Sequence, residues 1–265
     1  MPKNSNRYSI LIEAIFEKYY QKGITEFEFT RDEIVEQARS LSVKLPKNLG
    51  DVLYTFRYRA ELPESITSTA PSDREWIIRP AGRSRYKFVL VSQATITPSE
   101  RMAITKIPDS TPGIIAKYAL NDEQAVLAKI RYNRLIDIFT GITCYSLQNH
   151  LRTTIRELGQ VETDEIYVGI DKRGVHYVFP VQAKGQKDKI GIVQIEQDLV
   201  VCVNKFPRLV CRPIAAQSLS GNLIALFEFE EAIDGIRVTS EKHYQLVNSK
   251  NLSDEELLEY QRRLT

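Results

Sequence analysis

The chain has few of the residues that mark several common kinds of functional site. Its 265 residues include three cysteines, three histidines, two methionines and one tryptophan. The cysteines form no C-x-x-C pair, which argues against zinc fingers and against a disulfide framework. The histidines lie far apart along the sequence, which argues against a histidine metal triad. Neither familiar glycine-rich phosphate-binding loop is present.

Long apolar runs are also missing. No run approaches the roughly 20 apolar residues that a membrane-spanning helix needs, and the opening MPKNSNRYS lacks the apolar core of a signal peptide. With its few, unpaired cysteines, the chain is therefore expected to be a cytoplasmic protein with no membrane segment. The formal net charge is only +2, so any affinity for nucleic acid has to come from local basic patches. The hydrophobic share of 43% and charged share of 26% are typical of a globular protein.

The sequence pattern divides the chain into three blocks. Residues 1–92 show three helical patterns and then a β-hairpin pattern, EWIIRPAGRSRYKFVLV. Thr30, with Glu33 three residues later, is typical of a capping box at the start of a helix. Three helices followed by a hairpin predict a winged helix-turn-helix domain that binds DNA. Residues 93–115, with several Ser, Thr and Pro, predict an interdomain linker.

Residues 116–265 mix helical and strand patterns. Two helical patterns, over 121–141 and 144–158, precede the strand patterns QVETDEIYVGI and HYVFPVQAKG. A helix through DKIGIVQIEQDLVVCVNKF follows, then further strand patterns, a hairpin-like IRVTSEKHYQLV and a last polar helix. This order predicts a mixed α/β domain whose sheet is covered on both faces.

Polar side chains gather on the first two of these strand patterns. Glu162 and Asp164 alternate along the first, so they would share one face, with Glu165 on the other. Gln182 and Lys184 share a face at the end of the second, which is otherwise apolar. A lysine in a buried strand needs a partner or a task, because its ammonium group is costly to remove from water. If the strands are antiparallel neighbours, carboxylate, amide and ammonium groups converge.

Oxygen donors of this kind suit Mg²⁺, which is usually held by one or two carboxylates and keeps several waters. A lysine beside the metal could orient or deprotonate an attacking water, or stabilise charge that grows on a phosphorane. The group therefore predicts metal-dependent hydrolysis of a phosphodiester. The alternative is that the acids belong to an ordinary polar strand face and that Lys184 lies in a solvated turn with Gly185 and Lys187.

The segments ETDEIYVGI and YVFPVQAKG together resemble the PD-(D/E)xK nuclease superfamily, which includes many type II restriction endonucleases, resolvases and repair nucleases. The resemblance covers residues 120–244 and implies a restriction-endonuclease-like α/β/α core with a mixed sheet. Asp164 matches the first acid of the motif, and Gln182-Ala183-Lys184 matches its second half. An acid is usual at Gln182, and here the chain is similar to Gln-x-Lys branches such as the Mrr-like restriction nucleases.

The resemblance also implies a set of functional residues. Mg²⁺ would be bound by Asp164, Gln182 and the Ala183 carbonyl, and Glu162, Glu165 or Glu157 would complete the site. Basic residues of the N-terminal block, and a polar residue on the helix after the motif, predict contacts with DNA. These are Arg57, Arg59, Arg83, Arg85, Lys87 and Gln194. The alternative is that the basic residues only solvate the surface.

The function expected from these features is that of a type II restriction enzyme that cuts double-stranded DNA with Mg²⁺. Duplex cleavage needs two active sites, so a homodimer is expected, and a cognate DNA methyltransferase is a possible partner in the same system. Two alternatives remain open. One is a repair or structure-specific nuclease, and the other is a non-catalytic winged-helix regulator that binds DNA without cutting it.

Overall fold

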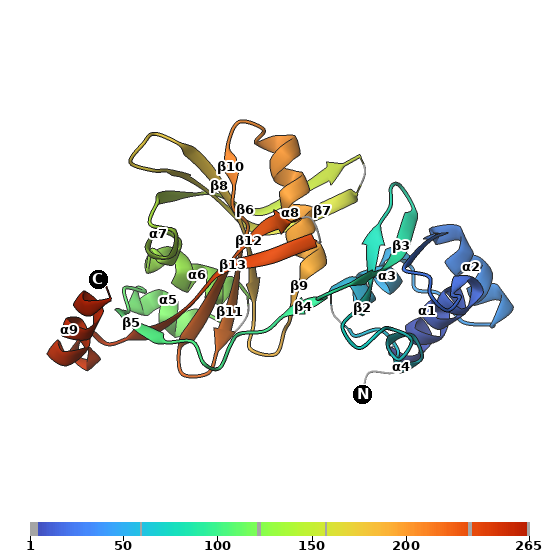
Figure 1. The fold of residues 1–265 in the computed structure, drawn as a ribbon, viewed down its shortest axis with the longest axis horizontal. Coiled ribbons are helices and arrows are strands. Elements are labelled where there is room, and N and C mark those ends of the chain that lie inside the picture. The colour runs from blue at the N-terminus through green and yellow to red at the C-terminus, as the bar shows by residue number, and fades with distance from the viewer. Residues whose placement is uncertain (1–4, 59, 121–122, 157, 233–234, 264–265) are drawn as a thin grey trace. The chain divides into compact units, whose positions relative to one another are not determined.

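The computed structural model describes residues 5–58, 60–120, 123–156, 158–232 and 235–263 (Figure 1). The chain forms two compact units. Unit 1 consists of Met1–Ile96, Arg152–Val161 and Gly191–Gln197, and unit 2 of Thr97–Leu151, Glu162–Ile190 and Asp198–Thr265. None of the described helices is long and apolar enough to cross a membrane.

Unit 1 begins with helices and ends in a hairpin. Its elements are α1 (Ser5–Tyr19), β1 (Glu26–Thr30), α2 (Arg31–Ser40), α3 (Gly50–Tyr58), α4 (Glu64–Thr67), β2 (Glu75–Pro80) and β3 (Arg85–Val91). The three strands form an antiparallel sheet in the order β1-β3-β2. Phe16 on α1 makes edge-to-face contacts with Phe27, Trp76 and Phe88, so aromatic side chains join the helices to the sheet.

The capping box predicted at the start of α2 is confirmed. The backbone N–H of Thr30 donates to Glu33 Oε2 at 2.8 Å, and the N–H of Glu33 donates to Thr30 Oγ1 at 3.4 Å. Lys18 and Tyr19 of α1 donate to Glu33 Oε1. Burial alone would raise the pKa of Glu33, but these hydrogen bonds lower it to about 2. The cap of α2 therefore also joins α2 to α1.

The rest of the chain contains both strands and helices. The elements are β4 (Thr95–Ile96), β5 (Ile104–Pro108), α5 (Gly113–Tyr118), α6 (Glu123–Tyr132), α7 (Leu135–Thr140), β6 (Thr143–Ile155), β7 (Gly159–Ile170), β8 (His176–Lys184), β9 (Ile190–Gly191), α8 (Ile192–Lys205), β10 (Val210–Cys211), β11 (Ile214–Leu219), β12 (Leu223–Ala232), β13 (Gly235–Val247), the 3₁₀ helix η1 (Ser249–Asn251) and α9 (Asp254–Arg262).

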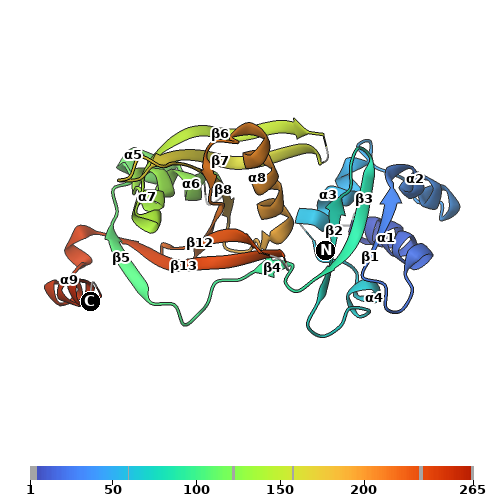
Figure 2. The ribbon, with the colours of Figure 1, turned by 45° about the horizontal axis from the view of Figure 1, so that its top comes forward.

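Most of these strands form one mixed sheet, seen from two directions in Figures 1 and 2. Its order is β5-β13-β12-β11-β8-β7-β6, and β10 also pairs with β8. The central strand β8 runs antiparallel to β7 and parallel to β11. The predicted mixed α/β class is thus confirmed.

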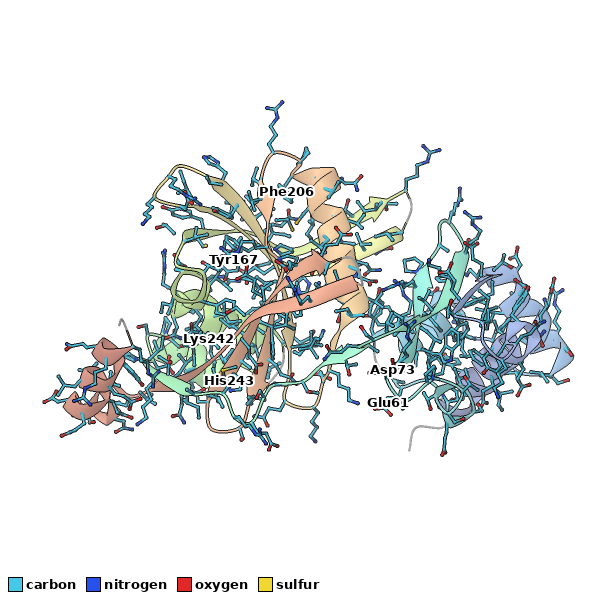
Figure 3. All side chains as sticks on the ribbon, viewed as in Figure 1. Glu61, Asp73, Tyr167, Phe206, Lys242 and His243 are labelled. Atoms are coloured by element: carbon cyan, nitrogen blue, oxygen red, sulfur yellow. The ribbon has the colours of Figure 1, made fainter. Side chains whose placement is uncertain are left out.

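Helices cover the sheet on both faces, as the sequence predicts. On one face, Leu127 and Ile130 of α6 belong to the same buried cluster as Phe179 and Val181 of β8. On the other face, Cys202 of α8 belongs to a cluster with Ile166 and Val178. On β13, Lys242 is exposed and its neighbour His243 is buried (Figure 3).

The prediction of a helix over 144–158 is wrong, because residues 144–155 belong to strand β6, next to β7. Cys144, Leu147 and Leu151 are apolar at helical spacing, while Tyr145, Leu147 and Leu151 also fit a spacing of two. Both periods are present in the sequence, and pairing with β7 decides between them.

Three other segments differ from expectation. The predicted linker over 93–115 contains β4 and β5, and β5 pairs in parallel with β13 from His243↔Ile104 to Val247↔Pro108. The predicted helix over 121–141 is divided into α6 and α7, because Arg134 adopts a left-handed φ of 52° between them. The expected hairpin near the C-terminus is the single strand β13.

Candidate active site

The candidate site lies in unit 2, where β7 and β8 stop pairing. Their register runs from Ile170↔His176 to Glu165↔Val181. At the next residue of β7, the Asp164 side chain reaches β8 and its Oδ2 accepts a hydrogen bond from the Ala183 backbone N–H at 2.8 Å. The carboxylate is therefore held against β8 at the residue between Gln182 and Lys184.

Lys184 is the buried lysine that the sequence predicts. Lys184 is 7% exposed, and its Nζ donates a hydrogen bond to Glu123 Oε1 at 2.9 Å. Glu123 is the first residue of α6. The start of this helix thus brings a second carboxylate to the same end of β8.

Sequence analysis did not find Glu123. An acid in the first turn of a helix has an ordinary explanation, since it interacts well with the helix dipole. The signal that could have identified it is the need of a buried lysine for an anionic partner.

The electrostatics of Asp164 show that these charges converge. Burial raises the pKa of Asp164 above its ordinary value of 3.8. The Ala183 N–H and the Lys184 ammonium act in the opposite direction, and the Glu123 carboxylate raises the pKa further. Two carboxylates thus share one lysine, a balance of charge that a bound cation would complete.

Gln182 is held by a buried acid on α8. Its Nε2 donates to both carboxylate oxygens of Asp198, at 3.1 and 3.0 Å. Thr163 Oγ1 donates to the same carboxylate at 2.5 Å. Burial raises the pKa of Asp198 to about 7, against the lowering effect of these hydrogen bonds. Sequence analysis also missed Asp198, although an acid on the apolar face of a helix was a visible signal.

The other candidate acids have different surroundings. Glu162 Oε1 lies 3.5 Å from His150 Nδ1, and the Glu162 side chain is 39% exposed. Glu165 is fully buried and accepts hydrogen bonds from Arg131 Nε at 3.0 Å and Ser146 Oγ at 2.5 Å. Its carboxylate faces α6 and β6 and does not join Asp164, which corrects the suggestion that Glu165 completes the site. Glu157 lies outside the described residues.

The donors near Asp164 suit Mg²⁺. They are the carboxylates of Asp164 and Glu123, the carbonyl of Ala183 and the side-chain amide of Gln182. One or two carboxylates with neutral oxygens are the usual protein ligands of this ion. In the described part of the chain, no group of three or more His, Cys, Asp or Glu residues is placed to hold a metal. Among the described residues, the donors at Asp164 are thus two carboxylates with neutral oxygens, and they do not form a cage of histidine, cysteine or acidic side chains.

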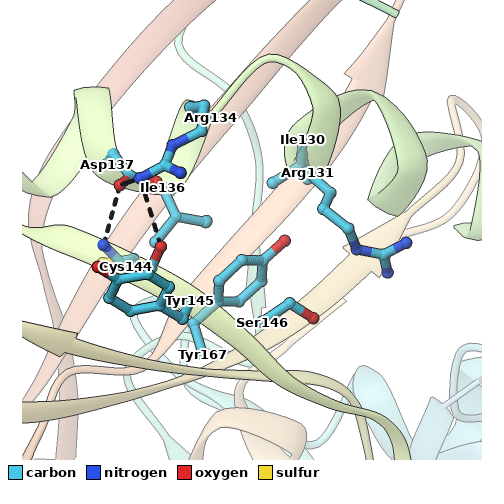
Figure 4. A pocket seen from close by; sticks show the side chains of 9 residues that line it. All are labelled: Ile130, Arg131, Arg134, Ile136, Asp137, Cys144, Tyr145, Ser146 and Tyr167. Carbon is cyan, nitrogen blue, oxygen red and sulfur yellow. Dashed lines mark hydrogen bonds and ion pairs between the residues drawn. The ribbon is translucent and has the colours of Figure 1, made fainter. Parts of the chain in front are cut away.

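A separate cavity of about 210 Å³ lies against β6 and β7 (Figure 4). It is lined by Ile130, Arg131, Arg134, Ile136, Asp137, Cys144, Tyr145, Ser146 and Tyr167. Asp137 accepts hydrogen bonds from Arg134 and from the Cys144 N–H, the latter at 2.9 Å. The ionic groups of the α7 side are thus already paired. The cavity shares none of the predicted catalytic residues.

The predicted DNA contacts of the hairpin in unit 1 are near the surface. Arg83 is exposed at the turn between β2 and β3. Arg85 is 60% exposed in its side chain and lies 3.8 Å from a carboxylate oxygen of Glu28, and Lys87 lies 3.2 Å from one of Glu26. The acids on β1 therefore partly neutralise these two cations, while Arg83 is at the tip.

The remaining residues predicted to contact DNA do not lie on the hairpin. Arg57 is half-buried, with its guanidinium group 4.8 Å from the ring centre of Tyr58. Its Nε and Nη2 are shielded from solvent and have no hydrogen-bond partner within the described chain. This position does not suit a contact with a DNA groove. Arg59 lies outside the described residues, and Gln194 is half-buried on α8.

Comparison of the chain with protein-family models, with curated proteins and with solved structures finds no match. The function proposed below therefore depends on the chemistry of the residues and on their arrangement.

Proposed function

We propose that this protein is a Mg²⁺-dependent DNA endonuclease, most simply a type II restriction enzyme. One observation carries the proposal. The Asp164 carboxylate accepts a hydrogen bond from the Ala183 backbone N–H, beside the ion pair that the buried Lys184 forms with the partly exposed Glu123. An ordinary strand face would leave these groups in water, whereas here burial acts on the Asp164 carboxylate of β7, beside the C-terminal end of β8.

The order of elements supports a restriction-endonuclease-like core. After the helices α6 and α7 come the strands β6, β7 and β8, then α8, and then β11 parallel to β8. The resemblance to the PD-(D/E)xK superfamily implies a helix, two strands, a helix and a strand around the motif. This order is present, with β6 as a further strand before β7 and with the two-residue strands β9 and β10 before and after α8. In unit 1, helices α1 to α3 followed by the β2-β3 hairpin support a winged helix-turn-helix.

Each residue has a chemical role in this proposal. Asp164, Glu123, Gln182 and the Ala183 carbonyl would hold Mg²⁺, which when bound neutralises phosphate charge and lowers the pKa of a coordinated water. Lys184, fixed by Glu123, supplies a cation beside the phosphate and orients the attacking water. The water oxygen forms a bond to phosphorus and loses a proton. The bond from phosphorus to the 3′ oxygen breaks, and that oxygen gains a proton.

Recognition of the substrate is assigned to unit 1. Arg83 at the hairpin tip and the partly paired Arg85 are suited to phosphate contacts. Cutting both strands of a duplex needs two sites, which a homodimer or two copies that meet on DNA would provide. Arg57 has no role in this proposal, because its guanidinium group is shielded.

The test is cleavage of plasmid and phage DNA, methylated and unmethylated, with Mg²⁺ or with EDTA. Wild type should cut at least one of these substrates only with Mg²⁺, and Asp164→Ala and Lys184→Ala should bind the same DNA without cutting it. Cleavage of branched DNA alone would indicate a repair nuclease. DNA binding with no cleavage of any substrate would indicate a regulator and would refute the nuclease proposal.

A further inference from the structure

Gln182 presents a chemical problem that the proposed function leaves open. The resemblance places an acid at this position, and a neutral amide is a weaker ligand for a divalent cation than a carboxylate. An amide also has two different ends. Only its oxygen can bind a cation, so its orientation decides whether Gln182 contributes at all.

The neighbours of Gln182 determine the orientation of the NH₂ and oxygen ends of its side-chain amide. Its residue is 1% exposed, and its Nε2 is within 3.1 Å of both oxygens of the Asp198 carboxylate. The same nitrogen lies 3.5 Å from the Glu162 backbone carbonyl. Both neighbours are hydrogen-bond acceptors, so each favours the NH₂ end of the amide. The oxygen Oε1 is then on the arm of the amide turned away from Asp198.

Asp198 is itself held in place. It is 0% exposed on α8, and Thr163 Oγ1 donates to its Oδ1. With Thr163 and Gln182 as donors, the buried carboxylate has the partners that its burial requires. A carboxylate held in this way cannot turn, and it cannot donate a hydrogen bond to Gln182 while it is ionised.

We infer that Asp198 is a positioning residue: by accepting from the Gln182 Nε2, it orients the amide so that Oε1 faces the divalent cation. The inference rests on the proposed function, because it concerns the same cation site. Residues that orient metal ligands in this way typically change metal affinity about 10- to 100-fold when they are replaced.

The hydrogen bond from the Gln182 amide to the Asp198 carboxylate predicts that the amide and the carboxylate can exchange places between the two positions. In Gln182→Glu, a second carboxylate would face Asp198 at the distance where Nε2 now lies, and the two charges would repel. In the double variant Gln182→Glu with Asp198→Asn, the donor and acceptor exchange places. The amide introduced on α8 can then donate to the carboxylate introduced on β8, and the usual acid of the motif is restored.

Calorimetric titration of the purified full chain with MgCl₂ and with MnCl₂, without DNA, tests the inference independently of cleavage. Wild type should bind, and Asp198→Asn should bind about 10- to 100-fold more weakly. Gln182→Glu should have a lower melting temperature than wild type. The double variant should recover the melting temperature and bind at least as tightly as wild type.

Asp137→Asn is the matched control. Asp137 is a carboxylate of unit 2 that is 18% exposed and well hydrogen-bonded, and it lies on α7 away from Gln182. This variant should bind both metals like wild type. If folded Asp198→Asn binds as wild type does, or if the double variant binds no better than Asp198→Asn, Asp198 does not position Gln182. If wild type binds neither metal, the proposed function fails. If wild type binds metal but the variants do not behave as described, only the role of Asp198 fails, so the two failures are distinguishable.

Discussion

Replacing Asp164 with asparagine should stabilise the protein in the absence of divalent metal. The Ala183 N–H now donates to Asp164 Oδ2 at 2.8 Å, and an asparagine Oδ1 can accept the same bond. What the substitution removes is a desolvated negative charge next to Glu123, which Lys184 offsets only in part. Removing unfavourable features of functional sites commonly stabilises proteins by about 0.5–2 kcal/mol. We expect about 1 kcal/mol, or a rise of about 2–4 °C in melting temperature.

The effect should depend on pH in a defined direction. The pKa of Asp164 is raised above its ordinary value of 3.8 in the folded protein. The carboxyl group therefore favours the fold while it is protonated, and this contribution is lost as the pH rises through the folded pKa. The advantage of Asp164→Asn should grow as the pH rises through the raised pKa of Asp164 and should disappear below about pH 3.8.

Scanning calorimetry in EDTA and in MgCl₂ measures both effects. Mg²⁺ at tenfold its dissociation constant should stabilise wild type by about 1.4 kcal/mol and should leave Asp164→Asn almost unchanged. Asp171→Asn is the control with the opposite sign. Burial raises the pKa of Asp171, but hydrogen bonds from Val175 and Arg173 lower it to about 2, so this variant should melt below wild type. A lower melting temperature for Asp164→Asn than for wild type at pH 7 in EDTA would refute the reasoning.

Three further substitutions or treatments have expected outcomes. Thr30→Ala removes the α2 cap and should lower the free energy of unfolding by about 1 kcal/mol in urea titrations; an unchanged midpoint would contradict the capping role. A Cβ at Gly169 would lie 2.9 Å from Ile142 Cγ2 and 3.0 Å from Phe179 Cε2. Gly169→Ala should therefore lower the free energy of unfolding by about 1–3 kcal/mol in the same assay. An unchanged free energy of unfolding would show that these side chains move to make room for the methyl group. Burial raises the pKa of the Cys144 thiol to about 11, so iodoacetamide at pH 8 should alkylate Cys144 only after unfolding, as peptide mass analysis can determine.

Several elements could be predicted because their signals are short-range. The Thr30 and Glu33 capping box needs only residues three apart, and it forms as predicted. The hairpin of β2 and β3 has two runs of β-branched and aromatic residues with a turn between them. Strand β6 could not be predicted in this way, since its apolar residues fit a helix as well as a strand, and its partner β7 decides.

The residues of the candidate site could be predicted where their signals lie within one strand pattern, and not where they depend on packing between elements. Asp164 lies within one strand pattern and Lys184 at the end of the next, and alternation predicts that their side chains approach each other if the two strands are antiparallel neighbours. Glu123 and Asp198 come from helices before and after those strands, and their contacts with Lys184 and Gln182 depend on how the helices pack on the sheet. A pattern within one helix, such as the acid on the apolar face of α8, does not identify the strand residue that the acid contacts. Glu165 was misplaced as a candidate ligand because an acid on a strand near the motif was weighed without its partner Arg131.

The most direct test of the central claim is the position of a divalent cation in crystals grown with MnCl₂, located by anomalous diffraction. An anomalous peak should lie within bonding distance of the Asp164 carboxylate, with the Ala183 carbonyl or the Gln182 side-chain oxygen as a second ligand, and the peak should be absent in Asp164→Asn. A Mn²⁺ ion bound elsewhere in unit 2, with none near Asp164, would contradict the claim that this end of β8 is a metal-dependent cleavage site.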